Sequence, residues 1–123
     1  MHHGSCLCGA VSFAVTAAPQ GPSVCHCGQC RKQSGHLWAS AYVAMADLSI
    51  SGTVKWYAAS AAAKRGFCPS CGSFLFWKAH AEDTMSFALG ALDGPTGITV
   101  EKHIFVADKG DYYDIADGVP QKD

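Results

Sequence analysis

The sequence contains few charged residues, and neither sign dominates. Asp, Glu, Lys and Arg make up 15% of the chain, with nine Lys and Arg against ten Asp and Glu and a formal net charge of -1. Proteins that bind nucleic acid usually carry a basic patch or tail, and this chain has neither. We therefore expect no nucleic-acid partner.

The sequence also lacks long apolar runs. No stretch of roughly 18 or more apolar residues occurs, which is the length that a membrane-spanning helix needs. The N-terminus leads from Met1 through His2 and His3 to Cys6 without the basic region and apolar core of an export signal. These absences favour a cytoplasmic protein without a membrane partner, and neither of these two histidines is assigned a function.

A third absence concerns helices. No window of helical length has a sustained apolar stripe, and no linker, repeat or low-complexity tract divides the chain. Instead, Gly, Ser, Thr and Pro separate short stretches rich in Val, Phe, Trp and Tyr, which is typical of β-rich proteins. With 49% hydrophobic residues, a chain of this length is most simply one domain. The sequence therefore predicts a single, mainly β domain over residues 1–123.

The pattern also predicts individual elements. The expected strands are Ala10–Val15, Leu37–Val43, Val54–Ala58, Ser73–Lys78, Met85–Leu89 and Val100–Val106. One helical turn is expected at Gln29–Ser34, where polar residues follow a cysteine and Gly35 ends the segment. Ala58–Lys64 has the alanine content of a helix but is flanked by turn residues, so it is interpreted as a connection.

Cysteine, by contrast, is abundant. The seven cysteines form three tight clusters: Cys6-Leu7-Cys8, Cys25-His26-Cys27-Gly28-Gln29-Cys30 and Cys68-Pro69-Ser70-Cys71. An odd count, spacings too short to join distant loops and the missing export signal argue against disulfides. Alternate side chains of an extended segment lie on one side, so Cys-x-Cys can present two sulfurs to one point, and a Cys-x-x-Cys turn does the same. The clusters are therefore interpreted as zinc ligands.

Seven thiolates divide naturally into four and three. Four close a tetrahedral zinc, whereas three leave a position that water or a substrate can fill. One pairing forms a zinc ribbon from Cys27, Cys30, Cys68 and Cys71, and leaves Cys6, Cys8 and Cys25 over. The other keeps every cluster intact, with a four-cysteine site of Cys6, Cys8, Cys68 and Cys71 and a three-cysteine site of Cys25, Cys27 and Cys30. Spacing alone does not decide, but we favour the second pairing because each metal then has at least three ligands.

The histidines are candidates for supporting roles. In an extended segment the side chain of His26 points away from Cys25 and Cys27, so it suits a group behind the ligands or one facing the substrate better than a fourth ligand. The alternative is a solvent-exposed histidine without a role. Because water can complete the three-cysteine site, the other histidines are expected to be structural: His36, His80 and His103.

The cysteines belong to three longer motifs: Gly4-Ser5-Cys6-Leu7-Cys8-Gly9, Cys25-His26-Cys27-Gly28-Gln29-Cys30-Arg31-Lys32-Gln33-Ser34-Gly35 and Arg65-Gly66-Phe67-Cys68-Pro69-Ser70-Cys71-Gly72-Ser73. Shorter motifs follow at Gly90-Ala91-Leu92-Asp93, His103-Ile104 and Val119-Pro120. In this order and spacing, the chain resembles the glutathione-dependent formaldehyde-activating enzyme family, whose domain also occurs in centromere protein V. The resemblance covers nearly the whole chain.

The resemblance implies a fold, two metals and an activity. The implied fold consists of several small, coiled antiparallel sheets clamped by zinc, similar to a small zinc-containing Rab exchange factor. The four-cysteine site would hold a structural zinc, and the three-cysteine site a second zinc with an exchangeable fourth ligand. The implied activity adds the thiol of glutathione to formaldehyde and gives S-hydroxymethylglutathione, which is a carbon-sulfur lyase reaction in reverse.

Departures from the family pattern lie away from the cysteines. Ser5 stands where a second glycine is common, and Tyr112 and Tyr113 occupy a region where tryptophan is usual. Gln121-Lys122-Asp123 replaces an aromatic close. These differences bear on the identity of the substrate more than on the zinc sites.

The hypothesis for function is a zinc-dependent carbon-sulfur lyase-type enzyme that acts on a small-molecule thiol and an aldehyde. An open zinc can polarise a carbonyl oxygen or lower the pKa of a bound thiol, and His26 would shuttle a proton. Because glutathione carries two carboxylates, Arg31 and Lys32 are candidate contacts for it, with solvated residues of a helical turn as the alternative. Trp38 and Phe67 would wall the pocket or, as aromatic residues near strands usually do, belong to the core.

Two other functions fit parts of the sequence. A zinc-stabilised protein-binding module without catalysis is consistent with the related exchange-factor fold and with the chromatin-associated relative. A redox sensor would use Cys27 and Cys30, but zinc ligation beside a third cysteine explains this pair more simply.

Overall fold

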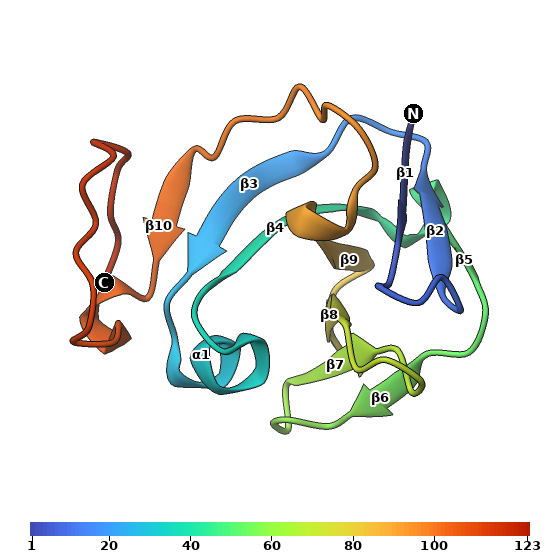
Figure 1. The fold of residues 1–123 in the computed structure, drawn as a ribbon, viewed down its shortest axis with the longest axis horizontal. Coiled ribbons are helices and arrows are strands. Elements are labelled where there is room, and N and C mark those ends of the chain that lie inside the picture. The colour runs from blue at the N-terminus through green and yellow to red at the C-terminus, as the bar shows by residue number, and fades with distance from the viewer.

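The computed structural model describes residues 1–123 and is mainly β, as the sequence predicts (Figure 1). The strands form two sheets, and one short α-helix and three single 3-10 turns connect them. None of the helices is both long and apolar enough to pass through a membrane.

The smaller sheet holds the N-terminus. Its strands are β1 (His2–Ser5), β2 (Ser12–Val15) and β5 (Leu48–Ser51), which pair antiparallel in the order β1-β2-β5. Phe13 and Val15 of β2 are buried while their neighbours Ser12 and Ala14 are half-buried, so the alternation seen in the sequence places one face of this strand in the core.

The larger sheet has seven strands in the order β10-β3-β4-β9-β8-β7-β6. Their bounds are Gln20–Cys25 for β3, Trp38–Ala44 for β4, Lys55–Tyr57 for β6, Ala63–Phe67 for β7, Phe74–Ala79 for β8, Thr84–Ala88 for β9 and Lys102–Ile104 for β10. All ladders are antiparallel except that of β10 with β3, which is parallel. The implied antiparallel pairing holds for every ladder except this one at the sheet edge.

The main core lies between the two sheets. Phe13 of β2 meets Phe76 of β8 edge to face, with ring centroids 5.2 Å apart, and it also packs on Phe87 of β9. Burying one such side chain stabilises a fold by about 1.5–3 kcal/mol. Cys6 and Cys68 belong to this core cluster, so the four-cysteine site is continuous with it.

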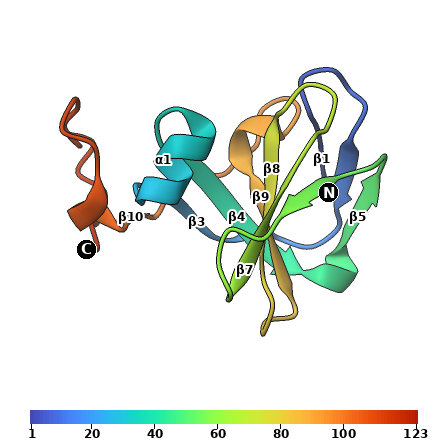
Figure 2. The same cartoon turned by 90° about the horizontal axis from the view of Figure 1, so that it is seen from below.

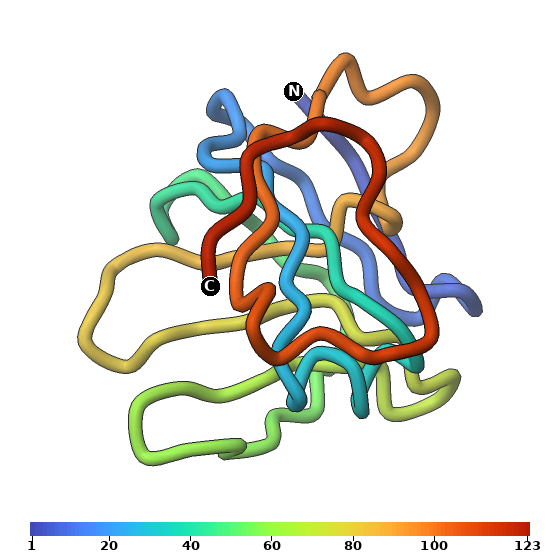
Figure 3. Tube along the Cα trace, turned by 90° about the vertical axis from the view of Figure 1, so that its left-hand side faces the viewer, coloured from blue at the N-terminus to red at the C-terminus, as the bar shows by residue number.

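Helix α1 (Gly28–Ser34) follows β3 after a two-residue turn, as the expected helical turn at 29–34 indicated, and Gly35 caps it. Figure 2 shows α1 between the C-terminal segment and the strands β8 and β9. The chain after β10 returns along the sheet edge, where the N–H of His103 donates to Pro120 and that of Val106 to Lys122. Figure 3 shows this last segment, in red, passing beside β3 and the turn into α1.

The structure also contains strands that the pattern did not indicate: β1, β3, β5 and β7. Strand β3 carries Gly21 and Pro22, and β7 reads Ala-Lys-Arg-Gly-Phe, so both contain residues that are uncommon in strands. Two boundaries were wrong as well. The connection assigned to 58–64 ends early because β7 begins at Ala63, and the strand expected at 100–106 is confined to Lys102–Ile104.

Candidate metal centres

The four-cysteine site joins two loops that are far apart in the sequence. Cys6 and Cys8 follow β1, and Cys68 and Cys71 lie between β7 and β8. All four sulfur atoms lie within 4.8 Å of one another, and Cys8 is 3.7 Å from Cys6 and 3.8 Å from Cys68. Zinc bonds of about 2.3 Å place the sulfurs of a tetrahedral site about 3.8 Å apart. The donor set and its spacing fit zinc.

Local backbone geometry shapes both loops of this site. Gly9 and Gly72 have left-handed φ angles of 82°, and their N–H groups donate to Cys6 and Cys68 and close the two turns. Within the second turn, the N–H groups of Ser70 and Cys71 point at the Cys68 sulfur at 3.4 Å. Donors directed at sulfur stabilise thiolates, which are the form that binds zinc.

The pKa of the half-buried Cys71 reflects the same environment. The Ser73 hydroxyl, 3.2 Å from the Cys71 sulfur, and the Ser73 N–H lower the pKa of Cys71 to about 5. Cys8 is the exposed member of the site, whereas Cys68 is completely buried. The site is thus anchored in the core on one side and open to water on the other.

The three-cysteine site is built from one short stretch of chain. Cys25 ends β3, Cys27 is the N-cap of α1, and Cys30 lies in the first turn of that helix. The Cys27 sulfur accepts the N–H of Cys30 at 3.3 Å, so the capping interaction also sets the spacing of two sulfurs. The three sulfurs lie within 4.8 Å of one another, and no histidine or carboxylate joins the cluster. Such a set can hold zinc with one position left for a further ligand.

The charge of Arg65 acts directly on this second site. Its Nη1 lies 3.5 Å from the Cys30 sulfur, and both side chains are buried. Interaction with the Cys25 thiol, together with this guanidinium, lowers the pKa of Cys30 to about 6. The pKa of Cys25 is raised in turn by its interaction with Cys30 and by burial.

His26 is fully buried, with an exposed fraction of 1%. The alternative of a solvent-exposed histidine is therefore wrong, because His103 of β10, which pairs with β3, and Tyr113 of the returning C-terminal segment cover this residue. Its Nδ1 is hydrogen-bonded to the Tyr113 hydroxyl, and its Nε2 lies 2.9 Å from His103 Nδ1. His103 Nε2 in turn lies 2.7 Å from Asp117 Oδ2. We call these four side chains the histidine relay.

The hydrogen bonds of the histidine relay have one consistent direction. An ionised Asp117 only accepts, so His103 donates from Nε2 and accepts at Nδ1 from His26, which leaves His26 Nδ1 to accept from the Tyr113 hydroxyl. The hydrogen bond from His103 lowers the pKa of Asp117, and burial lowers the pKa of His26. Asp117 is about half exposed, so the relay leads from the buried His26 to solvent.

Other residues that the sequence singled out lie around the three-cysteine site. Arg31 is half-buried and Lys32 is exposed on α1. Burial raises the pKa of Tyr113, and the nearby Arg31 charge opposes this increase.

His36 is exposed and hydrogen-bonded to the Tyr112 hydroxyl at 2.8 Å, while His80 is exposed as well. Phe67 is half-buried in β7 and lines neither the groove at Trp38 nor the pockets at His2 and Ser49.

Trp38 separates the three-cysteine site from a groove. It is buried against Cys25 and Cys30 and stacks on Phe74, with ring centroids 4.2 Å apart. Trp38 and Phe74 also line a groove of about 650 Å³ that extends to Leu7 and Cys71 of the other site. Trp38 thus belongs to the core and also walls a cavity, whereas the sequence offered these as alternatives.

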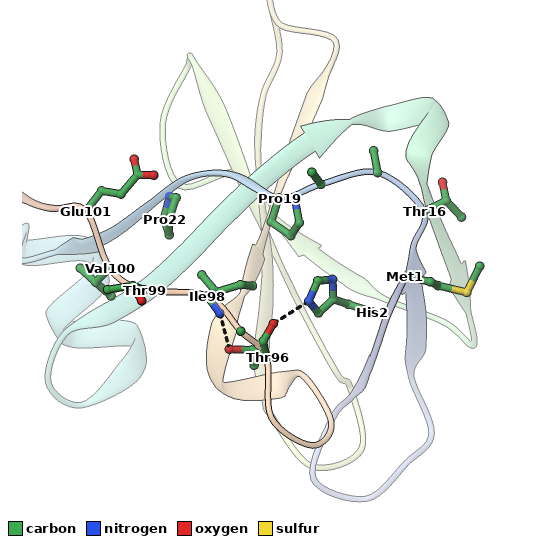
Figure 4. A pocket seen from close by; sticks show the side chains of 13 residues that line it. Met1, His2, Thr16, Pro19, Pro22, Thr96, Ile98, Thr99, Val100 and Glu101 are labelled. Atoms are coloured by element: carbon green, nitrogen blue, oxygen red, sulfur yellow. Dashed lines mark hydrogen bonds between the residues drawn. The ribbon is translucent and has the colours of Figure 1, made fainter.

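A second pocket of similar size, about 680 Å³, lies at the other end of the molecule (Figure 4). It contains His2, whose Nε2 lies 2.9 Å from the carbonyl oxygen of Thr96, and apolar residues such as Pro19 and Ile98. No cysteine lines it. The chemistry of the chain is therefore concentrated elsewhere.

Sequence reasoning missed three residues near the three-cysteine site: Arg65, Tyr113 and Asp117. Arg65 was visible as part of the Arg65-Gly66-Phe67 motif, but its partner Cys30 lies 35 positions away. Asp117 had no local signal, since its role depends on where the last segment returns to β10.

Comparisons with known proteins identify the family of this chain. The family model of the glutathione-dependent formaldehyde-activating enzyme matches residues 1–108. A Schizosaccharomyces pombe protein named as an uncharacterized lyase is 30% identical, over 94% of this chain and 85% of its own length. The crystal structure of a Rhodobacter sphaeroides protein superimposes with a TM-score of 0.57 and 26% identity, over 77% of this chain and 91% of that one. The chain belongs to the glutathione-dependent formaldehyde-activating enzyme family.

Proposed function

We propose that this protein is a zinc-dependent, lyase-type enzyme that forms and cleaves adducts of a thiol with an aldehyde at the three-cysteine site, with glutathione and formaldehyde as the substrates. The observation that carries the proposal is a set of three clustered sulfurs without a fourth protein ligand, beside a buried histidine relay. The four-cysteine site would hold a second zinc with a structural role.

The reaction defines what the residues must do. In the forward direction a carbon-sulfur bond forms, the thiol loses its proton, and the carbonyl oxygen gains one; the reverse reaction breaks the same bonds. When bound, zinc at Cys25, Cys27 and Cys30 supplies Lewis acidity and stabilises an anionic sulfur. The protein must therefore accept and return one proton close to these ligands.

The histidine relay is suited to this proton transfer. In the sequence, His26 stands between the proposed ligands Cys25 and Cys27. Its ring connects the Tyr113 hydroxyl to His103, and His103 connects to the half-exposed Asp117. In this arrangement Tyr113 and His26 receive the thiol proton and return it to the alkoxide oxygen, while Asp117 holds His103 in the tautomer that accepts from His26. Arg31 and Lys32 supply positive charge for the carboxylates of glutathione, and Arg31 lies near Tyr113.

The direct test combines metal content with a rate measurement. Protein purified without added metal is expected to contain close to two zinc per chain, since both cysteine groups fit zinc. Mixing glutathione with formaldehyde should then give the adduct faster than the spontaneous reaction, which must be subtracted. One zinc or none contradicts the metal assignment, and two zinc without acceleration contradicts the substrates.

Substitution of His26 tests the relay. His26→Gln is expected to lower the rate of adduct formation about 100-fold, the lower end of the range for a lost proton-transfer group. Zinc content should stay at the wild-type level, because His26 is not a ligand in this proposal. The matched control is His36→Gln, at the exposed histidine bonded to the neighbouring Tyr112, which should be near wild type. Equal rates for both variants would exclude a role of the relay.

A second candidate function rests on the groove beside Trp38. Its lining contains no Asp, Glu, Lys, Arg or His and includes Leu7, which is 90% exposed at the tip of the four-cysteine site. Leu7 shares this groove with Leu37, Trp38 and Phe74, and contiguous exposed apolar surface is typical of a protein-binding site. A zinc-stabilised binding module is favoured if two zinc are present and neither glutathione binding nor catalysis is found.

A further inference from the structure

Arg65 is a buried cation without a carboxylate partner. It lies in β7 with an exposed fraction of 5%, and the one salt bridge in the molecule joins His103 to Asp117 instead. Burying a charge in a protein is costly unless an opposite charge and hydrogen bonds compensate for it. The environment of Arg65 must therefore provide a negative charge.

The contacts of Arg65 identify that charge. Nε donates to Gln29 Oε1 at 3.2 Å and Nη1 to Gln33 Oε1 at 3.4 Å, and both partners are neutral amides of α1. The remaining contact of Nη1 is the Cys30 sulfur, at 3.5 Å. Cys30 is thus the one group in hydrogen-bonding contact with Arg65 that can carry a negative charge.

The charge of the metal-loaded site matches this requirement. Three thiolates and one divalent zinc leave one net negative charge, and Cys25 and Cys30 are both buried. The four-cysteine site has no such cation: its sulfurs receive backbone N–H groups and contact a serine hydroxyl, and Cys8 is exposed to water, which solvates the excess charge. The three-cysteine site has no exposed sulfur, so its excess charge needs an internal counter-ion.

We propose that Arg65 is the counter-ion of the three-cysteine site, a positioning residue whose charge makes the loaded site neutral and strengthens its hold on the metal. The inference rests on the proposed binding of zinc at this site. Gln29 and Gln33, one helical turn apart on α1, fix the guanidinium against Cys30, and Phe74 lies 5.4 Å from it on another side. A neutral loaded site also accepts an anionic fourth ligand, such as a thiolate, at a lower electrostatic cost than a negatively charged site without Arg65 would.

The test is competition of the zinc-loaded protein with a chromophoric chelator, which measures zinc affinity without an activity assay. Arg65→Met keeps the length and apolar stem of the side chain but removes the charge, and it is expected to weaken zinc binding at the three-cysteine site about 10–100-fold. Affinity at the four-cysteine site should not change. The chelator is expected to remove the two zinc ions in two steps. The Cys27→Ser variant retains only the four-cysteine site, so its single step shows which of the two belongs to that site.

Two further variants separate charge from shape. Arg65→Lys keeps the charge and should recover part of the lost affinity. Arg65→Gln is a polar neutral replacement whose amide ends at the position of Nε, the atom that bonds Gln29. It should bind zinc as weakly as Arg65→Met and serves as the neutral variant if Arg65→Met folds poorly. Wild-type affinity in both neutral variants, an equal loss at both sites, or a Lys variant no better than Gln would overturn the proposal. A wild-type chain with a single zinc would instead overturn the proposed function, and this inference with it.

Discussion

Replacing Cys68 with alanine is expected to leave almost no folded protein. Cys68 is completely buried in the main core cluster, and its sulfur is the acceptor around which the loop between β7 and β8 turns. Structural zinc sites contribute about 10–16 kcal/mol of apparent binding free energy, whereas domains are stable by only about 5–15 kcal/mol. Losing this ligand therefore removes a free energy comparable to the whole stability of the fold.

The measurement is the soluble yield and the thermal unfolding curve of Cys68→Ala. We expect aggregation or a non-cooperative transition, and treatment of the wild-type protein with a strong chelator should have the same effect. Ser70→Ala is the matched control, because Ser70 is an exposed residue of the same turn whose backbone makes the contact with the Cys68 sulfur. A Cys68→Ala protein that unfolds cooperatively near the wild-type temperature would show that the four-cysteine site is not structural.

Replacing Cys27 has the opposite expected outcome, a folded protein without catalysis. All three ligands of this site come from the end of β3 and the start of α1, so no distant segments depend on it to stay together. Cys27→Ala should contain one zinc per chain and should lose at least about 100-fold in the rate of adduct formation, because a bound zinc contributes several kcal/mol to transition-state stabilisation.

The control for Cys27→Ala addresses its second role as a helix cap. Alanine removes the acceptor for the N–H of Cys30, which costs about 1 kcal/mol, whereas serine keeps an acceptor but is a poor zinc ligand. Cys27→Ser should therefore be about 1 kcal/mol more stable than Cys27→Ala and equally inactive. If instead Cys27 variants unfold while Cys68 variants stay folded and inactive, the roles of the two sites are reversed.

The features that the sequence predicted well are those encoded locally. The three sulfurs of Cys25, Cys27 and Cys30 lie within six consecutive residues, and a turn followed by a helix brings them together without help from the rest of the fold. Strands such as β2 and β8 are rich in β-branched or aromatic residues, so their existence was also evident.

The features that the sequence did not predict depend on contacts between distant segments. Tyr113 lies 87 positions from His26, and His103 lies 77 positions from it. Their meeting requires the parallel pairing of β10 with β3, and no local pattern specifies that ladder. Strand β7 was missed because Lys64, Arg65 and Gly66 look like a turn, although Trp56 of β6 packs over the position that a side chain at Gly66 would fill. The charged side chain of Arg65 made a strand at this position look improbable, and the same charge is the one that we propose as the counter-ion of the three-cysteine site.

The different spans of the two cysteine groups also fix the order in which metal can be captured during folding. Cys8 and Cys68 are separated by 60 positions, so the four-cysteine site exists only after a long loop has closed and the two sheets have met. The residues 25–30 need only a single turn of chain, which forms orders of magnitude faster than long-range strand pairing. The sulfurs of the three-cysteine site can therefore meet on a nascent chain well before those of the four-cysteine site, which come together only as the sheets do.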